Sequence, residues 1–208
     1  MYLPEQSARY RALKPRADAV IEISPESLAY AADFAVRIGG APAKPAAASA
    51  PQAPSAASPS STKPVPSGAA LILDYGPAGT IPTNSLRGIR AHRPCSPFAS
   101  PGQVDVSADV DFVALAEAAI SASPGVEVHG PVEQAAFLAA MGIRERAEML
   151  VKRAKGDEER KRIEGGWKRL VDRGPQGMGR VYKAMAVVPH VPAGGGRRPV
   201  GFGGDISV

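Results

Sequence analysis

The sequence predicts an α/β domain, and three observations support this. The stretch "SPESLAYAADFAVRIGG" carries helix punctuation, with Ser24 as N-cap, Pro25 at the first helical position, and Gly39 with Gly40 as the stop. The apolar run "ALILDYG", residues 70–76, ends in a turn, which is typical of a strand covered on both faces in a parallel sheet. Helical and strand patterns then alternate as far as "GRVYKAMAVVP", which is predicted to be a further strand.

Composition limits the classes of function. The chain has 208 residues, of which 44% are hydrophobic, so it is long enough for one domain with a core, and it contains no apolar run long enough to span a membrane. Its single cysteine, Cys95, excludes an intramolecular disulfide and a cysteine-cluster metal site, and favours an intracellular or organellar protein. The net charge is +5, but basic and acidic residues alternate and aromatic residues are few. We therefore expect solvated helix faces, with neither a metal nor a nucleic acid as ligand.

Residues 41–67 are almost entirely Ala, Pro and Ser, a composition that predicts a disordered segment. An interdomain linker is one interpretation, and an insertion in the loop between a helix and a strand is the other. We favour the insertion because the flanking helix and strand patterns resemble consecutive parts of one unit. The predicted organisation is a helical part (1–40), the insertion (41–67), a second part of the same domain (68–190) and a flexible glycine-rich tail (191–208).

The second part contains further predicted elements. Residues 77–104 are expected to form a long functional loop. A helix is expected in "DVDFVALAEAAISAS", a strand in "GVEVHG", and a second helix starting at Pro131. Residues 143–173 are expected to form one or two charged helices with a bend at Gly165 and Gly166. The inward side chains of the first of these helices are predicted to be Phe112, Leu115, Ala119 and Ile120.

Carboxylates provide the candidate chemistry. Asp74 stands at the end of the apolar strand, where open α/β sheets bind ligands, and Asp105, Asp109 and Asp111 lie in "VDVSADVDF". Carboxylates that converge on a pocket could hold a guanidinium through paired hydrogen bonds. The alternative is that Asp74 only caps its turn and the other acids cap a helix. Spacing alone leaves both interpretations open.

The order of the segments is more specific than any one segment. "GAALILDYG", "TNSLRGIRAH", "PFASPGQVDVSADVDFVALAEAA", "VHGPVEQAAFLAAMGI" and "MGRVYKAMAVVP" resemble, in this order, the C-terminal half of the MidA-like family. That family comprises mitochondrial complex I assembly factors and bacterial relatives, classed as S-adenosylmethionine-dependent protein arginine methyltransferases. The resemblance spans roughly residues 9–39 and 68–190.

The resemblance implies a partial Rossmann-like fold, belonging to the seven-strand methyltransferase class, with helical additions. It implies S-adenosyl-L-methionine as cofactor and a mitochondrial protein that forms symmetric dimethylarginine on a core subunit of respiratory complex I. The glycine-rich cofactor turn of the family has no counterpart in these residues, so we expect the substrate-side half of the enzyme. The alternative is a non-catalytic fragment that binds the family's partners.

Individual positions match the family's motifs. The DYG turn corresponds to Asp74, Tyr75 and Gly76, and the LRG motif to Leu86, Arg87 and Gly88. Further matches are Pro101, Gly102, Asp105, Val110, Asp111 and Phe112. Asn84 and Ser85 depart from the Asp and Thr that the family commonly shows. On this basis Asp74, Asp105 and Asp111 are the candidates for orienting a substrate guanidinium.

Overall fold

The computed structural model describes residues 7–13, 15–40, 65–191 and 198–203. The predicted disordered insertion therefore lies outside the described residues, apart from 65–67. The same holds for most of the predicted flexible tail. The proposed domain boundaries remain a prediction.

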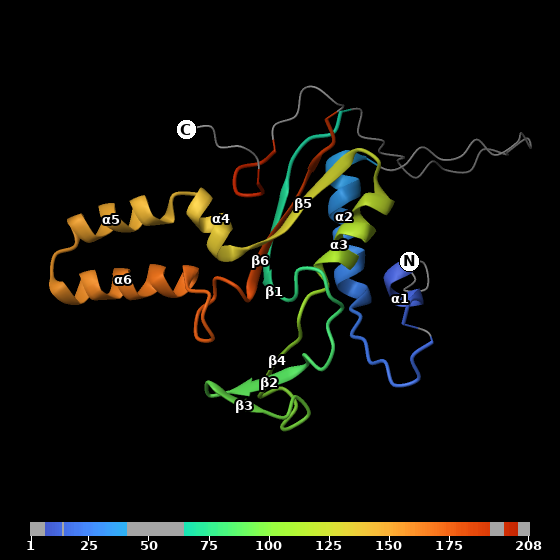
Figure 1. Ribbon diagram of the computed structural model, residues 1–208, viewed down its shortest axis with the longest axis horizontal. Helices are drawn as coiled ribbons and strands as arrows, with labels where there is room; N and C mark the ends of the chain where they lie inside the picture. Colours follow the sequence, from blue (N-terminus) through green and yellow to red (C-terminus); the bar gives the residue numbers. More distant parts are fainter. Residues whose placement is uncertain (1–6, 14, 41–64, 192–197, 204–208) are drawn as a thin grey trace, which may run out of the picture.

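The main sheet has three strands in the order β1 (Ala70–Tyr75), β6 (Tyr182–Pro189), β5 (Val126–Glu133), and both pairings are antiparallel (Figure 1). The mixed α/β class is confirmed, but the expected parallel pairing of the apolar strand is wrong for the described residues. Strands β1 and β5 run in the same direction, and β6 lies between them in the opposite direction. An apolar run carries no information about the direction of the neighbouring strand.

Strand β5 is longer than the sequence suggested. It continues through Gly130 and Pro131, whose peptide bond is cis, and the register of β5 on β6 shifts between His129 and Val132. Pro131 was expected to begin a helix, but helix α4 (Gln134–Ala140) begins three residues later. The register shift explains the difference, because a proline without an N–H is tolerated in a strand where the ladder is interrupted.

One face of the sheet is covered by α2 (Pro25–Gly39) and α3 (Phe112–Ala122), which lie side by side. Their contact is built from small buried side chains: Ala31, Ala35, Ala118 and Ala119. The backbones also meet at the helix ends, where a Cβ on Gly125 would fall 2.2 Å from the carbonyl oxygen of Gly39. The prediction that Ile120 faces inward is wrong, since it is 54% exposed.

The opposite face is only partly covered. Phe137 of α4 and Phe202, from the segment predicted as a flexible tail, pack on Ala184 and Ala186 of β6. The β1 residues that continue this face, Leu71 and Leu73, are 52% and 50% exposed. The expectation that β1 is covered on both faces is therefore wrong for the described residues.

Residues 77–104, expected to be a loop, contribute two strands to a second small sheet. Its order is β3 (Arg93–Cys95), β2 (Arg87–Arg90), β4 (Asp105–Ser107), with antiparallel pairings. These strands have only three or four residues and lack a continuous apolar run, so periodicity could not reveal them.

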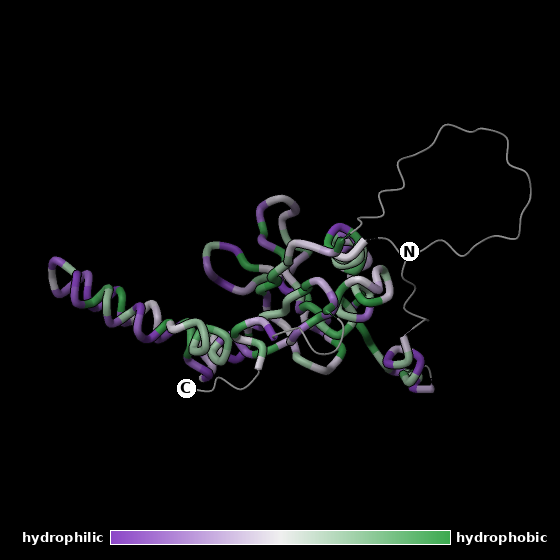
Figure 2. The backbone as a smooth tube through the Cα atoms, turned by 90° about the horizontal axis from the view of Figure 1, so that it is seen from above, coloured by the Kyte–Doolittle hydropathy of each residue, from purple (hydrophilic) through white to green (hydrophobic). Residues whose placement is uncertain are grey.

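Helices α5 (Ile143–Arg153) and α6 (Asp157–Val171) form a hairpin that projects away from the sheet (Figures 1 and 2). Two helices were one of the expected outcomes, but the turn lies at residues 154–156. Gly165 and Gly166 lie inside α6, so the predicted bend there is wrong. A short helix, α1 (Ala8–Arg11), packs near the start of α3. Within the described ranges no helix combines the length and apolar character needed to cross a bilayer.

Candidate functional site

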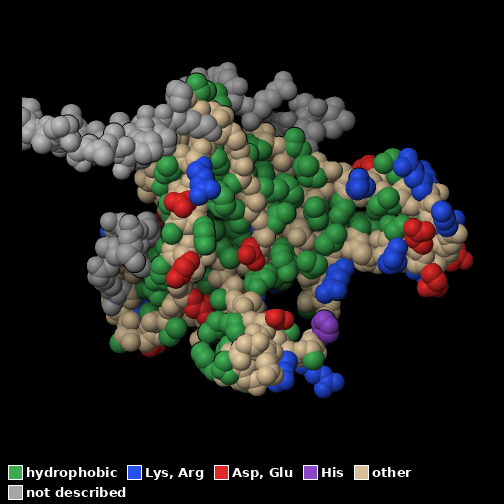
Figure 3. Space-filling model, turned by 180° about the vertical axis from the view of Figure 1, so that it is seen from behind, with side chains coloured by type: hydrophobic (Ala, Val, Ile, Leu, Met, Phe, Trp, Pro, Cys, Tyr) green, Lys and Arg blue, Asp and Glu red, His purple; other side chains and the backbone are tan. Residues whose placement is uncertain are grey.

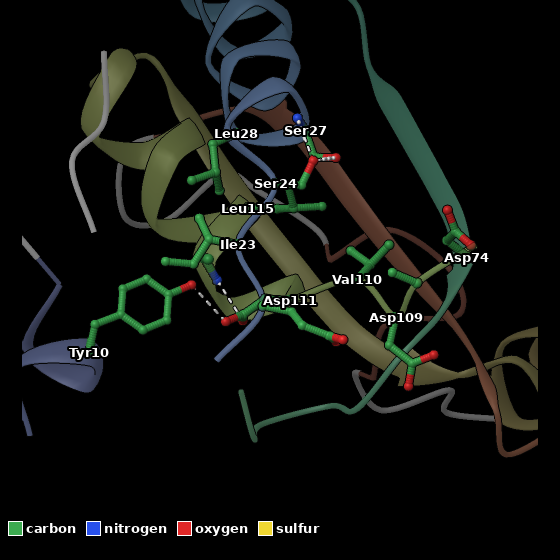
Figure 4. A pocket seen from close by; sticks show the side chains of 13 residues that line it. Tyr10, Ile23, Ser24, Ser27, Leu28, Asp74, Asp109, Val110, Asp111 and Leu115 are labelled. Atoms are coloured by element: carbon green, nitrogen blue, oxygen red, sulfur yellow. Dashed lines mark hydrogen bonds between the residues drawn. The ribbon is translucent and has the colours of Figure 1, made fainter. Parts of the chain in front are cut away.

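A pocket of about 310 Å³ lies where β1 ends and where α2 and α3 begin (Figure 4). N-cap residues fix the starts of both helices. The side chain of Ser24 accepts a hydrogen bond from the Ser27 N–H at the start of α2, and the side chain of Asp111 accepts one from the Ala114 N–H at the start of α3. Four carboxylates line the pocket and no Lys or Arg does: Glu22, Asp74, Asp109 and Asp111. The arrangement favours a cationic group as ligand.

Asp111 is held by partners on both of its oxygens. Oδ1 accepts from Arg9 at 2.8 Å and from the Ala114 N–H at 3.0 Å, and Oδ2 accepts from the Tyr10 hydroxyl at 3.0 Å. Figure 4 shows Tyr10 and Asp111 pointing toward each other across one side of the pocket. The Asp111 side chain is only 9% exposed. These contacts fit the cap interpretation and make Asp111 a support of the pocket wall.

Asp109 and Arg87 form the next pair. Arg87 donates to Asp109 at 2.8 Å, and its guanidinium lies 4.6 Å from the ring centroid of Tyr75. Burial alone would lower the pKa of Arg87, but the carboxylate of Asp109 and the nearby Tyr75 outweigh it and raise that pKa. Arg87 therefore stays charged and neutralises Asp109.

Glu22 is held mainly by neutral donors. Its carboxylate accepts from the N–H groups of Ser85, at 2.8 Å, and Leu86, at 3.0 Å, and also from the Ser85 hydroxyl. Burial opposes ionisation, but the hydrogen bond from the Ser85 hydroxyl and those from the two N–H groups lower the pKa of Glu22 below its usual value. Glu22 thus joins the segment before α2 to the loop before β2.

Asp74 differs from the other three carboxylates. It lies on β1, apart from Tyr10 and Asp111, and its Oδ1 accepts a hydrogen bond from the adjacent Tyr75 N–H at 2.8 Å (Figure 4). Among the described residues no cation pairs with Asp74. This carboxylate is the one in the pocket whose charge is left for a ligand.

Asp105 lies elsewhere. It is exposed at the start of β4 in the small sheet and does not line the pocket. Of the three candidates, the structure thus brings Asp74 and Asp111 to one pocket and leaves Asp105 outside it. The assignment of any of them to a reaction remains a prediction.

The glycines of both motifs permit close packing, Gly76 against a segment that lines the pocket and Gly88 within the small sheet. A Cβ on Gly76 would lie 2.3 Å from the Val110 carbonyl oxygen, and Gly76 has φ +157°. A Cβ on Gly88 would lie 2.7 Å from the Val104 side chain. The DYG turn is therefore packed directly against the segment that carries Asp109 and Asp111.

Sequence reasoning missed three residues of the site, namely Arg9, Tyr10 and Glu22. Glu22 stands between Ile21 and Ile23, and an acid between two β-branched apolar residues was the available signal. Arg9 and Tyr10 gave no such signal, because their partner Asp111 lies about a hundred residues away in the chain.

Comparison with known proteins agrees with the predicted relationship. Residues 2–132 match the protein family described as "Putative S-adenosyl-L-methionine-dependent methyltransferase". The match covers more than half of the chain. The chain belongs to this family. The family description names S-adenosyl-L-methionine as the cofactor on which its members depend.

Several curated relatives carry a more specific name. The protein arginine methyltransferase NDUFAF7, mitochondrial, of Mus musculus is 40% identical over 129 residues, which is 62% of this chain and 28% of that protein. The human protein of the same name is 35% identical over 130 residues, again 62% of this chain and 28% of that protein. The chain thus spans little more than a quarter of the length of these relatives.

The fold also has a counterpart among solved structures. An uncharacterized protein from Burkholderia thailandensis matches with a TM-score of 0.57 and 18% identity, over 95% of this chain and 45% of that one. At this identity the likeness concerns the fold alone.

The described residues do not fit S-adenosyl-L-methionine by themselves. A phosphate- or carboxylate-bearing ligand usually needs a glycine-rich turn whose N–H groups are open to it. The Val110 backbone occupies the space beside Gly76, two residues after Asp74, and the lining carboxylates would repel the carboxylate of the methionine moiety. What the described residues offer is a pocket suited to a cation.

Proposed function

We propose that Asp74 orients the guanidinium of a protein arginine during methylation, within an S-adenosyl-L-methionine-dependent arginine methyltransferase. The finer proposal follows the names of the relatives and the family resemblance. The enzyme acts in the mitochondrion on a core subunit of complex I, forms symmetric dimethylarginine, and supports assembly of the complex. The chain contributes the acceptor side of this site.

One observation carries the proposal: Asp74 lines an anionic pocket and has no cationic partner among the described residues. Asp109 and Asp111 are each paired with an arginine, and Glu22 is held by three hydrogen-bond donors. A guanidinium that enters the pocket could therefore pair with Asp74, the carboxylate that is not yet neutralised. The family membership and the arginine-methyltransferase names of the relatives support the same ligand.

The role proposed for Asp74 is to orient the arginine guanidinium. An arginine side chain remains protonated at neutral pH, because its pKa is above about 12. A carboxylate that accepts two of its N–H groups fixes the plane of the guanidinium and so the direction of its nitrogen lone pair. Methyl transfer would break the S–CH3 bond of the sulfonium donor, form an N–CH3 bond and release one N–H proton of the guanidinium, and it would depend chiefly on such alignment. The hydrogen bond from the Tyr75 N–H keeps Asp74 in place for this role.

A binding experiment on the 208-residue chain tests the ligand. Calorimetry would compare a short peptide that carries one arginine with the same peptide carrying citrulline, which has the same shape without the charge. We expect a preference for arginine of roughly tenfold or more, as is usual for hydrogen bonds to a charged group. Asp74→Asn should abolish the preference, and Asp105→Asn, at the exposed position, should leave it intact.

A second experiment tests the activity in a full-length relative. Exchanging the aspartate of its DYG turn for asparagine should abolish methyl transfer to arginine and leave cooperative unfolding unchanged. Turnover at the wild-type rate would remove this aspartate from the reaction. If the chain preferred the arginine peptide but the aspartate exchange left methyl transfer by the relative unchanged, the chain would be a binding fragment of the family.

A further inference from the structure

The projecting hairpin carries an apolar groove that takes no part in the proposed reaction. The groove has a volume of about 530 Å³ and lies along α5 and α6 near their junction with α4. It is lined by Leu138, Met141, Ile143, Arg146, Ala147, Leu150, Arg162, Ile163, Gly166, Trp167 and Leu170. The pocket that contains Asp74 shares none of these residues.

The helices of this hairpin leave their apolar stripe largely uncovered. None of the described side chains of α6 is fully buried, and in α5 only Ala147 is. Met141 and Leu150 are 56% and 42% exposed on the groove. A stripe of this kind normally faces a core, so its exposure on a projecting element indicates a surface for another molecule.

The charge of the groove selects the kind of molecule. The lining includes the guanidinium groups of Arg146 and Arg162 and no carboxylate. Within the described residues, neither arginine side chain has a hydrogen bond or an ion pair. Four neighbouring cations on the same helices are paired with acids three or four residues away: Arg144, Arg160, Lys161 and Lys168. The two unpaired arginines therefore give the apolar groove a positive rim, and Lys and Arg side chains border the hairpin in Figure 3.

Gly166 lines the groove at an exposed position. It lies in the interior of α6, where glycine is unfavourable relative to alanine. A Cβ placed on Gly166 would meet no atom within 4 Å, so the position is open toward the groove. The missing side chain lets another backbone approach α6 closely.

We infer that the groove binds an amphipathic helix of a partner protein whose apolar residues recur every three to four positions and are flanked by carboxylates. The apolar residues pack between α5 and α6, and the carboxylates pair with Arg146 and Arg162. This is the helix-in-groove mode of recognition. The arginine-bearing substrate is a poor occupant, because its charge has the same sign as the rim.

A second copy of the hairpin fits less well. It would have to offer carboxylates to the rim, but most acids of α5 and α6 already bond within their own hairpin. Glu148, Asp157, Glu158 and Glu164 are in ion pairs, and Glu159 accepts from the Lys155 N–H. Pairing with another copy would break these contacts.

A charge-reversal experiment on the whole chain tests the inference. The probe is a designed amphipathic peptide of about five helical turns, with Leu on one face and Glu beside it, and its counterpart has Lys in place of each Glu. Fluorescence of Trp167 reports binding, since it is the single tryptophan and lies in the groove. We expect the Glu peptide to bind at least about tenfold more tightly than the Lys peptide.

The double substitution Arg146→Glu with Arg162→Glu should reverse this preference. Both side chains are exposed and unpaired, so the variant should fold, which circular dichroism would verify. Equal binding of the two peptides by the wild type, or an unchanged preference in the variant, would overturn the inference. A dimer in sedimentation equilibrium that Leu150→Glu dissociates would also overturn it and assign the groove to a second copy.

A glycine pair provides a test that does not depend on charge. Gly166→Ala should raise the thermal stability of the chain, because alanine favours the helix, and yet weaken binding of the Glu peptide several-fold, because the added methyl group would project from a position that lines the groove. Gly165→Ala is the matched control, since Gly165 is equally open but does not line the groove. Gly165→Ala should stabilise the helix without weakening the binding of the Glu peptide. Equal effects of both substitutions on binding would contradict a helix seated on α6.

Discussion

The sheet side of the molecule and the projecting hairpin use their charged residues in opposite ways. Around the pocket, polar contacts join segments far apart in the sequence: Arg9 with Asp111, Glu22 with Ser85, and Arg87 with Asp109. On the hairpin, ion pairs join residues three or four positions apart on one helix, and their side chains are at least half exposed.

Packing follows the same division. The sheet and its covering helices bury several side chains completely, among them Phe112, Met185 and Val187, whereas α6 buries none. Contacts between distant segments fix a tertiary structure, and contacts within one helix only support that helix. The pocket is thus held in place by contacts between distant segments. The surface of the hairpin makes few such contacts and is left for the proposed partner.

The largest effect should come from removing a core aromatic side chain on the sheet side. Phe112→Ala should lower the free energy of unfolding by about 3–5 kcal/mol, because Phe112 is 0% exposed and packs among Tyr10, Leu28 and Met185. Urea denaturation followed by circular dichroism measures this change.

The hairpin offers the matched comparison. Leu170→Ala removes a partly buried side chain of α6 and should cost less than about 2 kcal/mol, the lower end for a buried leucine. If the two substitutions cost the same, the hairpin would be as tightly packed as the sheet and the comparison would fail.

A smaller effect is expected from acid. The pKa of Glu22 is lowered in the folded protein, so its ionised form contributes stability at every pH above the unfolded value of about 4.3. That contribution is lost as the pH falls through the folded pKa. Glu22→Gln should therefore flatten the fall of unfolding free energy between pH 5 and pH 3, roughly the range in which carboxylates titrate.

Glu148→Gln, on the hairpin, is the control for this measurement. Its ion pair with Arg144 is exposed on both sides, so the substitution should leave the shape of the stability curve nearly unchanged. A Glu22 variant that followed the wild-type curve would show that the hydrogen bonds from Ser85 and Leu86 add nothing to stability.

Local signals in the sequence predicted the elements whose structure is decided locally. Ser24 and Pro25 start α2 as expected, and Asp111 caps α3. Strand direction and helix breaks depend on tertiary contacts. The antiparallel β6 beside β1 and the continuous helix through Gly165 and Gly166 could therefore not be predicted from periodicity.

The residues of the pocket were likewise predictable only where a local pattern marks them. Asp74, expected near a ligand because it follows an apolar strand, does line a pocket, although the expectation assumed a parallel sheet and β1 pairs antiparallel with β6; its role as a ligand group remains a prediction. The separation of Asp105 from Asp111 could not be foreseen, since Asp105 belongs to a small sheet whose strands are too short to leave a pattern. Arg9, Tyr10 and Glu22 reach the pocket through contacts that span more than sixty residues.

The smallest expected change in stability is that from removing one exposed ion pair of the hairpin. Lys168 and Glu164 are 3.7 Å apart, and their side chains are 64% and 50% exposed. Exposed pairs four residues apart contribute about 0.3–0.5 kcal/mol, because water and salt screen them and two long side chains must be ordered. Glu164→Gln should therefore lower the free energy of unfolding by no more than about 0.5 kcal/mol, and added salt should abolish even that difference. A loss above about 1 kcal/mol, measured by urea denaturation, would mean that this pair braces the hairpin as the distant pairs brace the pocket.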